Sequence, residues 1–308
     1  MLAKVRASGD KGLLREIATS TLETLEEGSY ELDGTVHDLR SRIEHTNART
    51  AFHSAYSNLS KWSGVSQQET RTSEGPAIAV SECSVLAGTR ALKEKLDSIE
   101  GLEEKRVGVL NFASAKNPGG GFMTGAQAQE ESIARSSTIY PSLMTLTAQQ
   151  FYVSHRKDPK KGYYSHAMIY SPDVVFFRAD NGDWLSPMGA DIVTSAACNA
   201  GVIRRYLRED DSTDESDLDA AMKERMGRIL YLFERHGVRN LVLGSFGTGV
   251  FRNRVELVAE IWKELLVGEG ARFRGSFDRI LFAILGSSTF KVFVTTFSEA
   301  VGENIADP

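Results

Sequence analysis

The spacing of apolar residues divides the chain into two parts. In the first part, apolar residues recur three to five positions apart, beginning with Leu13, Leu14 and Ile17, and this period is typical of amphipathic helices. Residues 63–76 are rich in Ser, Thr, Gln and Gly, which indicates a connection. The pattern therefore predicts a helical accessory region over residues 1–75.

From Pro76 onward, short β-branched runs alternate with helical stretches. This alternation predicts an α/β domain over residues 76–308, with a mostly parallel or mixed sheet that helices cover on both faces. The predicted strands are Ala77–Val80, Arg106–Asn111, His166–Tyr170, Val174–Arg178, Asp191–Ser195, Asn240–Gly244 and Arg279–Leu285. The predicted helices are Ser84–Ser98, Ala126–Ser136, Ala220–His236, Val255–Leu266 and Thr289–Val301.

The loops that follow Asn111 and Gly244 are the most informative, because ligands of such sheets bind beyond the carboxyl ends of the strands. The first loop contains three consecutive glycines, Gly119, Gly120 and Gly121. Glycine runs cost backbone entropy and are favoured where φ is positive or where the backbone closely approaches a ligand. Their N–H groups can hold an anion. An ordinary flexible turn is the alternative.

Two adjacent carboxylates follow the glycines at the start of a predicted helix, in the sequence Gln129, Glu130 and Glu131. Acidic residues also favour a helix N-terminus for electrostatic reasons alone. In a partly buried cleft, however, each carboxylate disfavours ionisation of the other, so one can stay protonated and act as a general acid. Cleavage of a glycosidic bond needs such an acid. Neighbouring helical residues point about 100° apart, so we expect one to transfer a proton and the other to position sugar hydroxyls.

The second loop joins the apolar strand 241–243 to a predicted helix, which is an arrangement that binds phosphates through backbone N–H groups and the helix dipole. It has neither the Gly-Lys-Ser/Thr of a Walker loop nor the downstream acidic residue of a nicotinamide site. Phe246 and Phe251 flank its glycines, and each is expected either to pack in the core or to cover a ribose or adenine face. The two loops together predict a sugar–pyrophosphate ligand with a catalytic carboxylate at one end.

Composition narrows the class of protein further. The 308 residues are 41% hydrophobic and 25% charged, as in ordinary globular proteins, and the net charge of −5 argues against direct DNA binding. Cys83 and Cys198 are too few for a disulfide framework. The chain has no signal-peptide run and no stretch long enough to span a membrane. We expect an intracellular protein, cytoplasmic and, in a eukaryote, possible in the nucleus, without membrane partners.

Three other segments have local interpretations. Arg208–Asp217 is acidic and is expected to form a solvated surface loop. His155–Lys161 is basic and is also expected to form a surface loop, with contact to a phosphate-rich polymer as the alternative. Asn199 follows a predicted strand and is expected to form a turn or cap a helix, with ligand contact as the alternative.

At this point the motifs resemble a known family. The glycine triplet followed after seven residues by Gln-Glu-Glu resembles the signature of poly(ADP-ribose) glycohydrolases, and NFASAKNPGGGF, STIYPSL and SPDVVFFRADNG look like the microbial branch. GSFGTGVF resembles the pyrophosphate loop of macrodomains. The resemblance covers residues 77–300, and the front of the chain is similar to the microbial N-terminal extension. It implies a three-layer α/β/α macrodomain with a mixed central sheet and an N-terminal helical extension.

The resemblance also implies residue roles. Glu131 would be the general acid and base, Glu130 would orient the reacting ribose, and Gln129 would brace the glycine loop or the ribose. Phe251 would pack over the distal ribose. Ser114 stands where the family often has Asn, and this sequence departs from the family pattern there. The other implied substrate-binding residues are Asn111, Gly119, Gly120, Gly121, Ser245, Phe246, Gly247, Thr248, Gly249 and Val250.

The implied activity is hydrolysis of the ribose–ribose bonds of poly(ADP-ribose), mainly from chain ends, with release of ADP-ribose. The expected partners are the polymer, ADP-ribose and poly(ADP-ribosyl)ated proteins. No cofactor is expected, and no metal, because the six histidines lack ligand spacing and the family uses none. Two alternatives stay open: a macrodomain that binds ADP-ribose without cleaving it, and a hydrolase of another ADP-ribose linkage.

Overall fold

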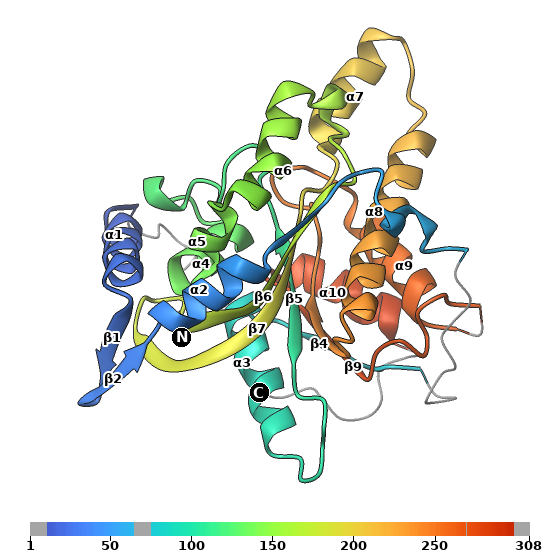
Figure 1. Ribbon diagram of the computed structural model, residues 1–308. Coiled ribbons are helices and arrows are strands. Elements are labelled where there is room, and N and C mark those ends of the chain that lie inside the picture. Colours follow the sequence, from blue (N-terminus) through green and yellow to red (C-terminus); the bar gives the residue numbers. More distant parts are fainter. Residues whose placement is uncertain (1–10, 65–74, 269, 299–308) are drawn as a thin grey trace.

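A mixed seven-stranded sheet forms the centre of the molecule (Figure 1). The computed structural model describes residues 11–64, 75–268 and 270–298. Strand order across the sheet is β3-β6-β7-β5-β8-β9-β4, with β7, β5, β8, β9 and β4 parallel to one another. The strands are β3 (Ala51–His53), β4 (Ala77–Ser81), β5 (Val107–Phe112), β6 (Met168–Arg178), β7 (Trp184–Ser195), β8 (Asn240–Leu243) and β9 (Arg279–Ala283).

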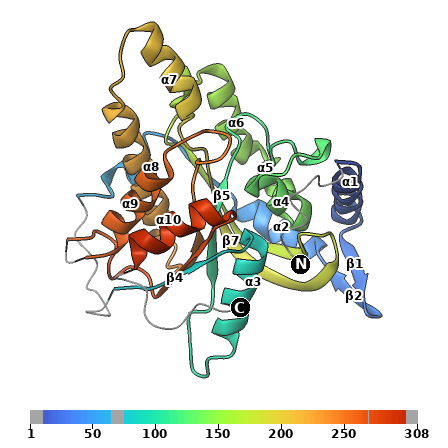
Figure 2. The same ribbon diagram turned by 180° about the vertical axis from the view of Figure 1, so that it is seen from behind.

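Helices cover both faces of this sheet, which confirms the predicted three-layer α/β/α architecture. Figure 2 shows one group of helices on one side and a second group on the other. The first group comprises α8 (Ser216–Arg235), α9 (Val255–Leu266) and α10 (Ser287–Phe297). The second comprises α3 (Val85–Asp97), α4 (Gln129–Ser136), α5 (Ile139–Leu143) and α6 (Leu146–Lys157), and α7 (Ala200–Glu209) stands beyond the strand ends.

Alternation along the strands explains why two layers of helices are needed. On β8, Leu241 and Leu243 pack into the core shared with α8, α9 and α10, whereas Val242 between them packs into the core on the opposite face. A strand that is apolar on both faces must be covered on both. The approach is close, since a Cβ on Gly108 of β5 would come within 2.6 Å of the Phe233 ring of α8.

The front of the chain is not wholly helical, and the prediction for residues 1–75 is wrong in that respect. Between α1 (Lys11–Glu27) and α2 (Arg40–Arg49) lies a hairpin of β1 (Ser29–Leu32) and β2 (Thr35–Asp38). Its two-residue turn is Asp33-Gly34, both with positive φ, a sequence that favours a type I′ hairpin turn. The Asp-Gly signal therefore outweighs the apolar spacing.

The same region also contributes to the central sheet. Phe52, which the apolar spacing assigned to a helix, lies in β3, and β3 pairs antiparallel with β6. A short helix η2 (Asn58–Lys61) follows. Most of the predicted connection at 63–76, and the end of the helix predicted over Thr289–Val301, lie outside the described residues.

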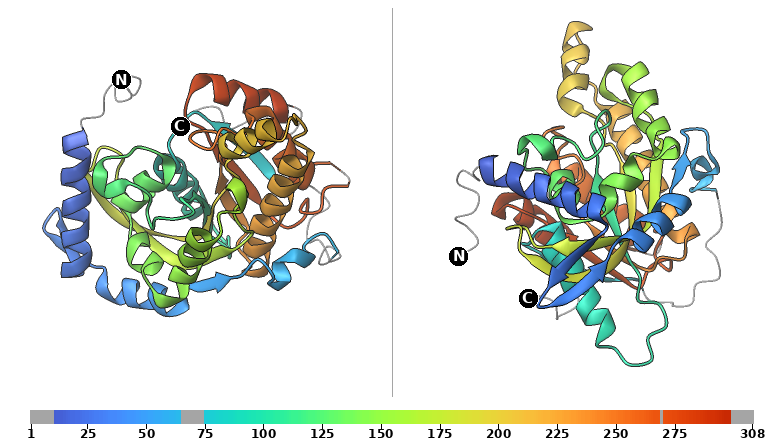
Figure 3. Two further views of the ribbon diagram at one scale, coloured as in Figure 1. Left: turned by 90° about the horizontal axis from the view of Figure 1, so that it is seen from above. Right: turned by 60° about the vertical axis from the view of Figure 1, so that its left-hand side comes forward.

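Helix α1 supports the segment that carries the glycine triplet. It lies at the margin of the molecule (Figure 3). The Thr21 hydroxyl donates to the Arg135 carbonyl of α4 at 2.6 Å, and Arg15 donates to the Thr124 carbonyl of η3 (Phe122–Thr124) at 3.2 Å. A Cβ on Gly125 would come within 2.9 Å of the Lys11 carbonyl oxygen. The accessory region thus buttresses the loop and helix that follow β5.

Two predicted strands merge into one long strand. β6 continues through Pro172 and Asp173 with a shift of register against β7 between Ser171 and Val174. Asp173 has a φ of 51°, so the irregularity is a bulge at which the chain bends without leaving the sheet. The sequence predicted two strands here, and the bulge joins them into one.

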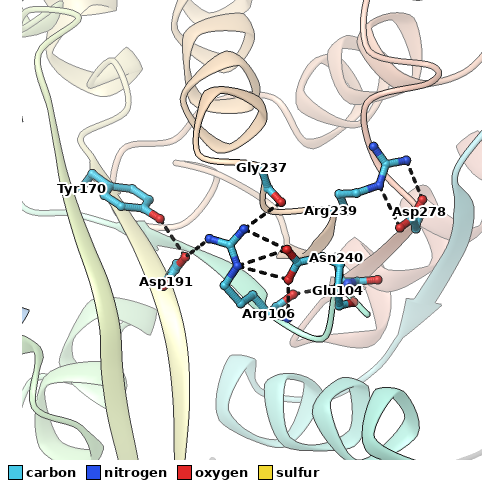
Figure 4. Close-up of polar contacts among 8 residues, drawn as sticks. All are labelled: Glu104, Arg106, Tyr170, Asp191, Gly237, Arg239, Asn240 and Asp278. Atoms are coloured by element: carbon cyan, nitrogen blue, oxygen red, sulfur yellow. Dashed lines mark hydrogen bonds and ion pairs between the residues drawn. The ribbon is translucent and has the colours of Figure 1, made fainter. Parts of the chain in front are cut away.

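A polar network fixes the amino ends of the parallel strands, at the edge opposite the loops of interest (Figure 4). Arg106 bonds the Glu104 carboxylate at 2.8 Å and the Gly237 carbonyl at 3.0 Å, and lies 3.5 Å from the Asp191 carboxylate. The Tyr170 hydroxyl also donates to Asp191, at 2.7 Å. The network ties β5, β6 and β7 to the end of α8.

No helix in the described ranges of the chain combines the length and the apolar character needed to cross a bilayer.

Candidate active site

A cleft of about 570 Å³ lies beyond the carboxyl ends of β5, β8, β9 and β4. The two loops singled out from the sequence meet there. The first contributes Ser114, Asn117, Gly120 and Gly121, and α4 contributes Gln129, Glu130 and Glu131. The second contributes Ser245, Gly247, Thr248, Gly249, Val250 and Phe251.

The glycine triplet lies directly against the two carboxylates. Gly119 and Gly120 have φ values of 67° and 60°, which residues with a Cβ rarely adopt. A Cβ on Gly120 would overlap Oε1 of Glu131 and come within 2.9 Å of Oε2 of Glu130. Glycine is therefore required at this position both by conformation and by the close approach of the acidic side chains.

Glu131 joins the glycine loop to the start of α4. Its Oε1 accepts from the Gly121 N–H at 2.9 Å, and its Oε2 accepts from the Ala128 N–H at 3.0 Å. The second bond is the reach-back of a third-position acid to the residue before the helix. Glu131 is 8% exposed and borders the cleft, so its carboxyl group is held in place where a ligand can reach it.

Glu130 is more deeply buried, at 2% exposure. Its Oε2 accepts from the Ser114 N–H at 2.6 Å. Burial raises the pKa of Glu130 well above its usual range, and the neighbouring charge of Glu131 raises this pKa further, against the lowering effects of the Ser114 and Asn111 contacts. The pair is therefore unequal, with Glu130 the carboxyl that favours its protonated form.

Asn111 lies against Glu130 and is not among the residues that line the cleft, so its ribose contact stays a prediction. The side chain is fully buried on β5 and donates to the Thr194 hydroxyl at 3.2 Å. The Tyr152 hydroxyl is also buried without a partner in the described part of the chain, and the charge of Glu130 contributes to the raised pKa of this phenol, which burial dominates. Asn111 and Tyr152 thus form the polar floor under Glu130.

Gln129 anchors α4 to the sheet. Its side-chain nitrogen donates to the Leu110 carbonyl at 2.6 Å, and its side-chain oxygen accepts from the Phe112 N–H at 2.9 Å. It therefore braces the helix against β5 while bordering the cleft, and the polar atoms of its amide bond β5 and not the glycine loop.

The second loop is held by a buried asparagine. The Asn253 amide donates to the Gly247 carbonyl at 2.9 Å and to the Cys198 carbonyl at 2.8 Å. Gly247 has a φ of 74°, and a Cβ there would overlap Ala197. Asn199 caps α7 through the Val202 N–H at 3.1 Å, as expected. These contacts fix the loop against the segment that follows β7.

The two phenylalanines of this loop have different roles. Phe246 is fully buried with its ring 5.6 Å from that of Phe112, so of the two expectations for this side chain the structure shows the core packing. Phe251 borders the cleft and its ring lies 5.9 Å from Tyr164. The sequence could not decide between core packing and ligand contact for either ring, because the direction of each side chain depends on the conformation of the loop.

Several backbone N–H groups of the second loop are available for an anion. Those of Phe246, Thr248 and Arg252 donate to carbonyl groups within the loop. Those of residues 247 and 249–251 have no acceptor among the residues that the structure describes. No atom lies within 4 Å of a Cβ built on Gly249, so the cleft is open there.

The far end of the cleft was not foreseen. Ser84 caps α3 through the Ala87 N–H at 3.0 Å and borders the cleft beside Val85. Leu285 and Thr289, from the connection between β9 and α10, border it as well. Ser84 carried a capping signal, but nothing in the sequence marked the other residues as neighbours of the site.

No cluster of three or more His, Cys, Asp or Glu side chains suited to a metal ion occurs in the described parts of the chain. The chemistry available is that of two unequal carboxyl groups beside a curved, amide-lined cleft. One group can transfer a proton while the other holds a hydroxyl, which suits cleavage at an acetal carbon. Fold and site together define a glycosidic-bond hydrolase on a macrodomain-like sandwich.

The comparisons identify the family. The catalytic domain of the microbial-type poly(ADP-ribose) glycohydrolases (PARG) matches residues 18–179, and the chain belongs to this family. It is 34% identical to the PARG of Thermomonospora curvata, whose crystal structure matches with a TM-score of 0.80 over 92% of this chain and 99% of that one. A structure of that enzyme with the inhibitor ADP-HPD has a TM-score of 0.78 at the same identity and coverage.

A second bacterial relative agrees. The PARG of Deinococcus radiodurans in complex with ADP-ribose is 31% identical, with a TM-score of 0.71 over 88% of this chain and 99% of that one. Among curated proteins none matches the chain.

Proposed function

We propose that Glu131 transfers the proton in the hydrolysis of ribose–ribose bonds of poly(ADP-ribose), the reaction of the family to which the chain belongs. The arrangement that carries this proposal is the pair Glu130 and Glu131 pressed against Gly120. Glu131 borders the cleft and is oriented by two N–H groups. In its protonated form a carboxyl group so placed can donate its proton to the leaving ribose oxygen, and the resulting carboxylate can then accept a proton from the attacking water.

Glu130 holds the reacting ribose. Its raised pKa favours the neutral acid, which can donate a hydrogen bond to a sugar hydroxyl as well as accept one. A neutral neighbour also leaves the negative charge that Glu131 acquires on proton transfer free to stabilise the oxocarbenium-like centre. Neighbouring positions on α4 thus divide the work between proton transfer and positioning.

The N–H groups of residues 247 and 249–251 bind the diphosphate, and Phe251 packs over the distal ribose. Support comes from the amides without acceptors and from the open space at Gly249. The glycine triplet flanks the same diphosphate. ADP-ribose, which is bound in the structure of the Deinococcus radiodurans relative, has the shape and charge that this cleft would hold.

Cleavage is mainly from chain ends, and the substrate is the polymer on poly(ADP-ribosyl)ated proteins. Leu285 and Thr289 of the β9–α10 connection border the end of the cleft remote from the carboxylates. We propose that they limit the passage of polymer beyond this end. A terminal unit fits such an end, whereas an internal unit would need the chain to pass through it.

The test is turnover of labelled polymer, with products separated by chain length over time. The wild-type chain should release ADP-ribose from the outset, while Glu131→Gln should abolish release and keep ADP-ribose affinity within about tenfold. Normal turnover by Glu131→Gln would refute the role of Glu131. Binding without turnover by the wild-type chain would favour the macrodomain that only binds. Early products of intermediate length would contradict cleavage from chain ends.

A further inference from the structure

Four exposed basic residues lie on segments that border or adjoin the end of the cleft nearest the carboxylates. Lys116 precedes Asn117, which borders the cleft, and Arg156 at the end of α6 donates to the Lys116 carbonyl at 2.7 Å. Lys160 begins η4 (Lys160–Gly162), and Arg252 follows Phe251 in the second loop. We call Lys116, Arg156, Lys160 and Arg252 the basic rim.

A row of aromatic rings joins the two sides of the basic rim. The His155 ring lies 5.6 Å from that of Tyr164, which lies 5.9 Å from that of Phe251. The Asn199 N–H at the start of α7 donates to the Gly162 carbonyl at 2.8 Å. Helices α6 and α7 therefore stand together above this end of the sheet, as Figure 1 shows.

The basic rim lies on the side of the cleft where the scissile bond is expected. The cleft runs from the loop after β5 across β8 to β9 and β4, and the carboxylates belong to the β5 end. Burial raises the pKa of the Tyr152 phenol, the charge of Glu130 raises this pKa further, and the charge of Arg156 lowers it. Both charges therefore act on the same buried side chain.

These positive charges have no carboxylate partners. None of the ion pairs among the described residues involves the basic rim, whereas Arg204 and Arg254 nearby are paired with Glu215 and Asp219. Asp158, the closest acidic residue in sequence, accepts from the backbone N–H of Lys160 at 3.0 Å. Unpaired charges of one sign around a cleft attract a ligand of the opposite sign.

We infer that the basic rim binds the diphosphate of the polymer unit next to the one held in the cleft, on the leaving-group side of the scissile bond. The inference rests on the proposed function, because only a polymer carries a second diphosphate beyond the cleaved ribose. The product ADP-ribose leaves the basic rim unoccupied. Contacts at the basic rim strengthen binding of the polymer without strengthening binding of ADP-ribose. This difference favours release of ADP-ribose after each cleavage.

The test compares ADP-ribose with the two-unit oligomer in the Glu131→Gln background, where neither ligand is consumed. Lys116→Glu combined with Lys160→Glu should weaken oligomer binding at least tenfold, about 1.4 kcal/mol, and leave ADP-ribose affinity unchanged. Lys95→Glu, an exposed reversal in the last turn of α3, is the matched control and should change neither. Equal losses for both ligands, or no loss for the oligomer, would overturn the inference.

Salt dependence gives a second measurement that needs no rim variant. Oligomer affinity should fall more steeply with salt than ADP-ribose affinity, since each neutralised phosphate contributes roughly 0.7 to the slope of log K against log salt for a single strand. Equal slopes would count against the basic rim. Because binding is measured without turnover, failure of the wild-type chain to cleave polymer would refute the proposed function and leave this result standing.

Discussion

The two carboxyl groups of the site differ in their burial. Glu130 lies inside with a raised pKa, and Glu131 lies at the cleft surface with two N–H donors. Adjacent positions on one helix turn thus have different chemistry, because only the first points at the polar floor of Asn111 and Tyr152.

The raised pKa of Glu130 predicts a stability change with a defined sign. Above the ordinary value of 4.5, the folded chain keeps a proton that the unfolded chain loses, so the free energy of unfolding falls as the pH rises from there toward the folded pKa. Glu130→Gln removes this loss. In urea unfolding it should be more stable than the wild type at pH 8 and lose that advantage near pH 4. A constant difference across pH would contradict the assignment.

Gly120 should be intolerant of any side chain. In Gly120→Ala the Cβ meets Oε1 of Glu131 in a backbone with a φ of 60°, which displaces the carboxyl group. We expect turnover of polymer to fall about 100-fold, the usual effect of a 1 Å misplacement. Gly101→Ala is the matched control, because Gly101 has a φ of 70° and open space around its Cβ. If both variants lost turnover to a similar extent, backbone strain alone would explain the effect of Gly120→Ala.

The second loop makes its contribution as an element. Gly249→Val places a branched side chain in open space before the loop amides, at a φ that other residues adopt. The melting temperature should hold while ADP-ribose affinity, measured by calorimetry, weakens at least tenfold. Gly249→Ala should have a smaller effect in the same direction. Unchanged ADP-ribose affinity in Gly249→Val would refute the assignment of this loop to diphosphate binding.

Which elements could be predicted from sequence follows from the range of the forces involved. Strands β5 and β8 and the helices after them have strong local patterns, and both glycine loops were placed correctly at the cleft. The hairpin at Asp33-Gly34 had a local signal too, but the apolar spacing obscured it. The pairing of β3 with β6 had none, because it joins segments more than 100 residues apart.

Side-chain direction was the other limit. Asn111 lies near the end of an apolar strand whose loop borders the cleft, yet its side chain is buried against Glu130. Phe246 and Phe251 flank the same glycines, yet Phe246 is fully buried in the core, whereas Phe251 packs against that core and also borders the cleft. The direction of these side chains depends on tertiary contacts, such as those by which Asn253 holds the second loop.

For the whole molecule, the cleft lies at the carboxyl ends of the parallel strands and the polar network around Asp191 lies at their amino ends. Asp191 is 5% exposed and accepts from Tyr170 at 2.7 Å and from the Asp173 N–H at 2.9 Å, beside Arg106. Asp191→Ala should therefore lower the free energy of unfolding by about 3 kcal/mol, as expected when one partner of a buried network is removed. Urea unfolding would measure this loss.

The matched control is Asp97→Ala, which breaks an exposed pair with Lys93 and should cost less than about 1 kcal/mol. ADP-ribose affinity should be unchanged in both variants, because neither residue borders the cleft. A weaker affinity in Asp191→Ala would show that the two edges are coupled.

The three residues of β3 have a consequence for any shortened form of the chain. They occupy the hydrogen-bonding groups along part of one border of β6, and an unoccupied strand border is a template on which another chain can add. Removing everything before residue 75 would leave that border bare. The shortened protein would then be prone to self-association, even with every residue of the cleft intact.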